Sequence, residues 1–215
     1  MTSAYSEASF RPSSTTVHSP LRRGLKPYQS TSQSPRRQEL LARIGVEDFK
    51  TLSLDIDESY PEGLSPEDTV RYIAKKKCDA AAALCAPDDL IITADTMVFL
   101  DNDRLGKPHD EEDALRMLRE LAGRGHTVCT GVSVRRGAQE ERFAVSTRVF
   151  FRPMTDDEIR AYIKTGEPMD KAGAYGVQSR GALLVERIDG DFFNVMGLPV
   201  EQLGLVLARF GVKLL

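Results

Sequence analysis

Helical and strand-like apolar patterns alternate between residues 34 and 210, and this alternation limits the fold more than any other feature. Apolar residues at helical spacing predict helices over 34–44, 65–85, 111–121, 155–166 and 199–210. Shorter apolar runs predict strands over 90–94, 127–134 and 143–151, with hairpins at 97–103 and at 182–196 through Asp189-Gly190. No internal repeat is visible. The pattern predicts an α/β fold in which helices flank a mixed, twisted sheet.

The 215 residues suffice for one sizeable core. We expect a disordered or poorly ordered tail over 1–30, because that segment is rich in Ser, Thr and Arg, has one acid and lacks a periodic pattern. An organelle transit peptide is the alternative for this segment. The folded domain then covers 31–215.

Charge and cysteine content argue against several classes of protein. The net charge is −3, so no basic field indicates nucleic-acid binding, and no apolar run is long enough to predict a membrane span. Three cysteines, without a metal-type CxxC pair, are typical of thiols in a reducing compartment. We therefore expect a cytoplasmic protein without nucleic-acid or membrane partners.

The stretch SQSPRRQELL at 32–41 reads as an unusual helix start. Ser34 can cap the helix and Pro35 suits its first position. Arg36 and Arg37 then add charge to an already positive N-terminus, which favours a bound anion. The stretch predicts a phosphate site over 32–37. A solvated arginine pair is the alternative.

A lysine is expected on the inner face of the second helix. Val70, Ile73, Ala74, Ala81 and Leu84 define that face, and Lys77 shares it. A lysine there needs a partner or a cleft for its ammonium group, unless it extends to solvent at the edge of the apolar face.

Acidic residues stand where ligand-binding groups are expected. Asp95 and Thr96 follow the apolar run at 90–94, and DIDES holds Asp57 and Glu58. Carboxylates at a strand end suit Mg²⁺ carrying a substrate phosphate, and Asp95 could instead be a general base acting on water. For Asp57 and Glu58, ordinary loop acidity is the alternative.

Two further segments can contact a phosphorylated ligand. GKP places Lys107 in a turn, and the small residues of DKAGAYGVQ allow close backbone approach beside Lys171 and Gln178. The Gln178 amide could pair with a base edge. His126 is expected to be structural.

Taken in order, these stretches resemble the Maf family of nucleoside triphosphate pyrophosphatases. The match covers 32 to about 210 through SQSPRRQELL, DIDES, the helix with Lys77, ADT, GKP, GRGHTVCTGV, GEPMDKAGAYGVQ and GLP. The resemblance implies cleavage between the α- and β-phosphates of a nucleotide, a divalent cation (Mg²⁺ or Mn²⁺) and a homodimer. It also implies the two-lobed fold of inosine triphosphate pyrophosphatases, with a central cleft.

The resemblance assigns roles to single positions. Asp95 matches the proton acceptor, and Glu58 a metal-linked acid whose role Asp57 could share. The phosphate cleft is matched by Ser32, Arg36, Arg37, Lys77 and Lys107. Substrate-discriminating positions are matched by Arg36, Thr96 and Gln178. The second arginine-type residue of SPRR and the AYGVQ loop resemble the branch acting on dTTP and UTP.

One departure from the family concerns the first strand. The family has a short apolar strand before the first motif, whereas this chain has the polar run GLKPYQSTSQSPRR. Either a weak strand persists over 28–31 or the strand is damaged. Two other functions remain open: hydrolysis of modified nucleotides, and a catalytically weak nucleotide-binding regulator.

Overall fold

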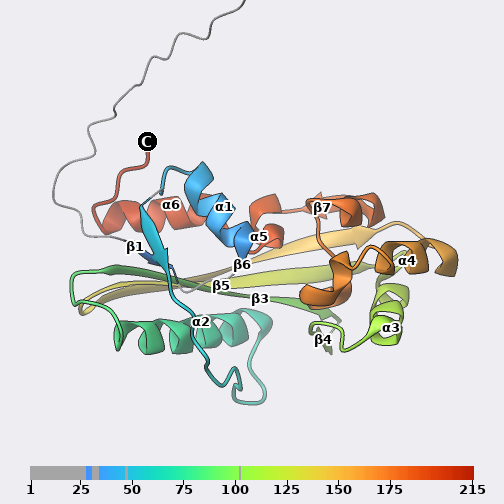
Figure 1. Cartoon of the computed structure of the whole chain (residues 1–215), viewed down its shortest axis with the longest axis horizontal. Coiled ribbons are helices and arrows are strands. Elements are labelled where there is room, and N and C mark those ends of the chain that lie inside the picture. Colours follow the sequence, from blue (N-terminus) through green and yellow to red (C-terminus); the bar gives the residue numbers. More distant parts are fainter. Residues whose placement is uncertain (1–27, 31–33, 47, 102) are drawn as a thin grey trace, which may run out of the picture.

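The computed structural model describes residues 28–30, 34–46, 48–101 and 103–215, and these form a mixed seven-stranded sheet (Figure 1). Its order is β2-β1-β3-β5-β6-β7, with β4 also paired to β3. Strand β1 is parallel to β2 and β3, and the other pairs are antiparallel. The strands are β1 Tyr28–Ser30, β2 Phe49–Thr51, β3 Leu90–Leu100, β4 Asp103–Leu105, β5 Gly125–Arg136, β6 Gln139–Phe151 and β7 Val185–Asp189.

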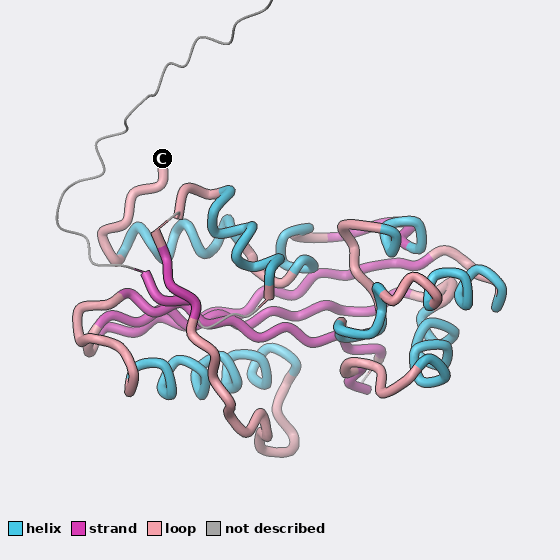
Figure 2. Tube along the Cα trace, in the orientation of Figure 1, coloured by secondary structure: helices cyan, strands magenta, loops and turns pink. Residues whose placement is uncertain are grey.

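Helices cover both faces of the sheet, which confirms the predicted α/β class (Figure 2). Helix α2 packs on one face, α1, α5 and α6 lie on the other, and α3 and α4 pack together at the end near β4. The helices are α1 Pro35–Arg43, α2 Pro66–Ala82, α3 Glu111–Leu121, α4 Asp156–Ile163, α5 Phe192–Met196 and α6 Val200–Arg209, with 3₁₀ turns η1 Glu167–Asp170, η2 Ala172–Ala174 and η3 Arg180–Leu184. None of the described helices is long and apolar enough to cross a membrane.

The long strand β3 corrects one prediction. The sequence indicated a short strand over 90–94 and a separate hairpin strand over 97–100, with Asp95 at a strand end. In the structure, β3 runs without interruption and pairs with β5 from Ile91 to Phe99. Polar side chains are tolerated inside it because they find partners; the Thr93 hydroxyl, for example, donates to the carbonyl of Ala74 at 2.6 Å. Asp95 therefore lies in the middle of a central strand.

The weak first strand persists. Strand β1 pairs with β2 and with β3, even though its sequence is polar. It reaches only Ile92 of β3, and β4 pairs with β3 only from Val98 onward. Among the described residues, no strand pairs with the same edge of β3 between these two points. A short length of strand edge over 93–97, unpaired with any other described strand, thus lies between β1 and β4.

Helix α2 lies in direct contact with the sheet. Ser65 caps it by accepting from the backbone N–H of Asp68. A Cβ added to Gly131 of β5 would lie 2.3 Å from the backbone carbon of Val70, so only glycine allows this approach. Leu84 was predicted on the inner face but is 68% exposed, because the helix ends at Ala82.

The predicted hairpin over 182–196 is also wrong. Residues Phe192–Met196 form helix α5 instead of a strand. Asp191 caps this helix by accepting from the N–H of Phe193, and Gly197 ends it with φ 112°, a value that favours glycine. The chain after β7 therefore turns back over the sheet, and Gly197 reaches the unpaired edge of β3 beside Thr96.

Candidate active site

A cavity of about 620 Å³ opens at the unpaired edge of β3. Its walls come from the start of α1, the loop that carries Glu58, α2 at Lys77, β3, β4 and the turn after it, η1, the loop after η2 and the end of α5. Nine residues predicted from the sequence line it: Arg36, Arg37, Glu58, Lys77, Asp95, Thr96, Lys107, Lys171 and Gln178. Ser32 lies outside the described residues.

Lys77 is shared between two carboxylates on one wall of the cavity. Its Nζ lies 2.7 Å from Oδ1 of Asp95 and 2.8 Å from Oε1 of Glu58. The Lys77 and Asp95 side chains are nearly buried, with 15% and 10% exposed, whereas Glu58 is half exposed. The prediction that Lys77 faces inward toward a partner is confirmed. Burial favours the protonated form of Glu58, but hydrogen bonding and charge from Lys77 outweigh it and lower the Glu58 pKa.

Asp95 keeps one acceptor atom without a partner. Its Oδ2 is buried and has no hydrogen bond in the described part of the chain. A buried carboxylate oxygen of this kind is suited to an attacking water molecule or a cation. The described residues contain no cluster of three or more His, Cys, Asp or Glu side chains able to hold a metal. Asp95 and Glu58 together fit Mg²⁺ or Mn²⁺ only with phosphate oxygens completing the coordination.

Arg37 joins three separate parts of the cavity wall. Its Nε donates to the carbonyl of Gly197 at 2.7 Å, and its two terminal nitrogens donate to the carbonyl of Ala94 at 2.9 Å and the hydroxyl of Thr96 at 2.8 Å. Burial lowers the Arg37 pKa, although Asp95 opposes this effect. Arg37 therefore fixes α1 against the unpaired edge of β3 and the end of α5.

Thr96 projects from β3 on the side opposite Asp95, because successive strand residues alternate between faces. Besides accepting from Arg37, its hydroxyl lies 2.9 Å from that of Thr130. The Thr130 hydroxyl in turn donates to the carbonyl of Asn194 in α5. Thr96 is thus part of a polar contact between the sheet and α5.

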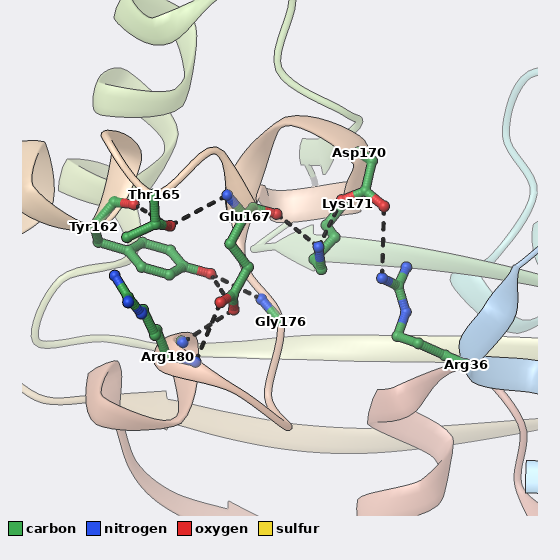
Figure 3. Close-up of polar contacts among 9 residues, drawn as sticks. Arg36, Tyr162, Thr165, Glu167, Asp170, Lys171, Gly176 and Arg180 are labelled. Atoms are coloured by element: carbon green, nitrogen blue, oxygen red, sulfur yellow. Dashed lines mark hydrogen bonds and ion pairs between the residues drawn. The ribbon is translucent and has the colours of Figure 1, made fainter. Parts of the chain in front are cut away.

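Arg36 reaches across the cavity. Its guanidinium lies 3.7 Å from a carboxylate oxygen of Asp170 in η1, a bridge visible in Figure 3. The neighbouring Lys171 donates to the carbonyl of Glu167 at 2.6 Å and pairs with Asp170. Lys107 and Gln178 are exposed at the cavity rim.

The structure also bears on the sequence-based expectations for Asp57 and His126. Asp57 is not among the cavity-lining residues, and it accepts from the N–H of Ser59 at 2.9 Å. Glu58 is therefore the acid of this loop that lines the cavity and pairs with Lys77. His126 is buried, with Nε2 2.8 Å from the Tyr175 hydroxyl, which agrees with a structural role.

Sequence reasoning missed Arg104, which lines the cavity and contributes positive charge near Glu58. Arg104 stands on β4, a strand too short to give a periodic signal. The run DKAGAYGVQ indicated a loop that contacts a ligand, and its Tyr175 also lines the cavity.

The fold and the cavity define an α/β protein whose cleft combines several cations with a pair of carboxylates. The match to the family model Maf-like protein covers residues 31–210, and the chain belongs to this family. A relative from Bacillus velezensis named dTTP/UTP pyrophosphatase is 48% identical over 182 residues, which is 85% of this chain and 95% of that protein. A second, from Dictyoglomus turgidum, has the same name and is 47% identical over 187 residues, 86% of this chain and 96% of that protein.

Among solved structures, a nucleoside-triphosphatase (dITP/XTP pyrophosphatase) from Mycobacterium abscessus aligns with a TM-score of 0.41 and 11% identity. The alignment covers 86% of this chain and 98% of that chain.

Proposed function

We propose that the chain is a nucleoside triphosphate pyrophosphatase that hydrolyses dTTP and UTP to the monophosphate and pyrophosphate. The observation that carries this proposal is the arrangement of Asp95, Lys77 and Glu58 at the cavity wall, opposite Arg36. This arrangement supports the proposal because a carboxylate able to accept a proton, a cation and a second acid lie beside a cleft suited to a polyanion. The names of the relatives supply the substrate class.

In the proposed reaction, a water molecule attacks the α-phosphorus and the bond to the β-phosphate oxygen breaks. Asp95 accepts the proton of the water through its unpartnered Oδ2. Lys77 and Lys107 stabilise the negative charge that develops on the leaving pyrophosphate. Arg36 exchanges its contact with Asp170 for a phosphate oxygen when substrate enters.

The proposal includes a divalent cation held by Asp95 and Glu58. When bound, Mg²⁺ or Mn²⁺ would polarise the phosphate and help to activate water. We expect chelation with EDTA to abolish turnover and added Mg²⁺ or Mn²⁺ to restore it. Full activity in EDTA, after metal analysis shows a metal-free protein, would remove the cation from the proposal. A homodimer in the cytoplasm completes the proposed picture, and it rests on the family resemblance and the cysteine usage.

The test uses purified protein, Mg²⁺ or Mn²⁺, and a panel of purine and pyrimidine triphosphates, with products separated by chromatography. In water labelled with ¹⁸O, attack at the α-phosphorus places the label in the monophosphate. We expect labelled monophosphate and unlabelled pyrophosphate from dTTP and UTP. Diphosphate with inorganic phosphate, or label only in pyrophosphate, would contradict the proposed mechanism. A preference for a modified nucleotide would move the chain to the alternative substrate class.

A further inference from the structure

The loop 176–181 carries Gln178 to the cavity rim and is closed at its base. A Cβ added to Gly181 would lie 2.4 Å from the carbonyl oxygen of Gly176, so the two ends of the loop are in contact. A Cβ on Gly176 would in turn lie 2.8 Å from the Lys171 side chain. The loop is therefore a tight unit whose tip depends on how its base is held.

One carboxylate and one phenol hold both ends of this loop (Figure 3). Glu167 accepts from the backbone N–H of Gly181 at 3.1 Å and of Arg180 at 3.2 Å. Tyr162 donates its hydroxyl proton to Glu167 at 2.9 Å and accepts from the N–H of Gly176 at 3.1 Å. Three backbone amides of one loop thus converge on two side chains from α4 and η1.

These two side chains lie behind the cavity rather than in it. Neither Tyr162 nor Glu167 is among the residues that line the cavity, whereas Gln178 is. Tyr162 is 6% exposed, and burial raises the pKa of its hydroxyl. Burial also opposes the charge on Glu167, yet the hydrogen bonds that it accepts lower its pKa. A charged acid kept in a half-buried place by loop amides indicates a fixed support.

We propose that Tyr162 and Glu167 are positioning residues that set nucleobase discrimination by fixing the loop that carries Gln178. The inference rests on the proposed function, because it concerns the base of the same nucleotide. The Gln178 amide offers a donor NH₂ group and an acceptor oxygen, which a base edge can match only if the amide is held in place. The phosphate-facing residues Lys77 and Asp95 belong to other elements, so the positioning acts on base choice.

Two variants test this proposal, together with a matched control. Tyr162→Phe removes the hydroxyl alone, and Glu167→Gln replaces an acceptor with a donor facing loop amides. Glu141→Gln is the control, because Glu141 on β6 is also a carboxylate that accepts hydrogen bonds, in its case from Arg209, and it lines neither the cavity nor the pocket formed by Tyr162 and Arg180.

The measurement is kcat and KM for dTTP, UTP and ATP, with hydrogen exchange of the loop amides. In both variants we expect the ratio of kcat/KM for dTTP over ATP to fall by about ten- to hundredfold, mainly through KM for dTTP, as for a misplaced substrate contact. Amide exchange at Gly176 and Gly181 should accelerate. The control should keep the wild-type ratio and the wild-type exchange at these amides.

An unchanged dTTP-to-ATP ratio in Tyr162→Phe and Glu167→Gln, with both variants folded, would overturn the proposal. An equal loss of kcat for all three nucleotides would also overturn it, because that pattern reports general damage to the fold. Failure of the wild-type protein to hydrolyse any triphosphate would instead defeat the proposed function. Should Glu167→Gln fail to fold, Tyr162→Phe decides alone, since it changes one oxygen atom.

Discussion

Replacement of Asp95 by Asn should separate catalysis from stability. The amide has nearly the shape of the carboxylate but cannot accept the proton of an attacking water. Loss of a general base typically lowers the rate by about 10²–10⁴-fold, which corresponds to about 2.7–5.4 kcal/mol of barrier. We therefore expect Asp95→Asn to lower kcat for dTTP by this factor.

The effect of Asp95→Asn on folding should be smaller. Lys77 keeps its contact with Glu58 at 2.8 Å, and the carbonyl oxygen of the new amide side chain replaces Oδ1 as an acceptor, so no cation is left alone. The hydrogen bond from Lys77 then has a neutral acceptor instead of a charged one, which lowers the free energy of unfolding by about 1–2 kcal/mol. For a chain of this length, that loss lowers the melting temperature by about 2–8 °C.

Lys77→Met provides the contrast. It leaves Asp95 and Glu58 facing one another without their shared cation, and removal of one member of a buried ion pair costs about 3–5 kcal/mol. Glu58 is half exposed, so the lower end of that range applies. Lys77→Met should therefore destabilise the protein more than Asp95→Asn does.

The assay pairs initial rates of dTTP hydrolysis with chemical denaturation of the same samples. Wild-type turnover in Asp95→Asn would refute Asp95 as the proton acceptor. Equal or greater stability of Lys77→Met, compared with Asp95→Asn, would refute the argument that Lys77 is shared between the two acids.

Two further predictions concern the fold that supports the site. Gly131→Ala should destabilise the protein by at least about 1–3 kcal/mol in denaturation experiments, because the added methyl group meets the backbone of Val70. Gly204→Ala has open space around the added methyl group and should stabilise the protein by about 0.5–1 kcal/mol. Similar effects of the two substitutions would contradict the described packing of α2. Burial, with a contribution from Arg148, lowers the pKa of His126 to about 4, so the unfolded chain binds the extra proton between pH 4 and 6.5. Stability should therefore fall by about 3 kcal/mol as the pH drops through that window, and His126→Gln should remove this part of the slope in denaturation curves.

Local signals predicted the helices well because capping and apolar spacing act within a few residues. The capping box of Thr155 and Glu158 is present in the structure, and α3 spans the predicted residues 111–121. The continuity of β3 was not predictable in the same way. It depends on pairing with β5 along the whole strand and on partners for Asp95 and Thr93 that come from α2.

The residues of the candidate site likewise differ in how far the sequence could predict them. Residue type and order predicted Lys77, Asp95 and Glu58 as site residues, because an inward-facing lysine requires an acidic partner. The sequence could not separate Asp57 from Glu58, since both are acids of one loop and only the path of that loop decides which faces Lys77. The contacts of Glu167 with the loop that carries Gln178 could not be predicted either, because they are made to backbone amides, which any residue supplies.

The two arginines at the start of α1 illustrate why a sequence motif does not by itself show which of its residues contacts the ligand and which supports the fold. Both were assigned to phosphate because both stand at a positive helix end. In the structure, Arg37 donates to the carbonyls of Ala94 and Gly197, which are acceptors at an unpaired strand edge and a helix end, whereas Arg36 crosses the cavity to Asp170. Buried backbone acceptors at an unpaired strand edge require donors, and Arg37 supplies them. The Arg37 guanidinium is therefore occupied by the edge of the sheet. Arg36 is the arginine of this pair that can exchange a protein carboxylate for a phosphate.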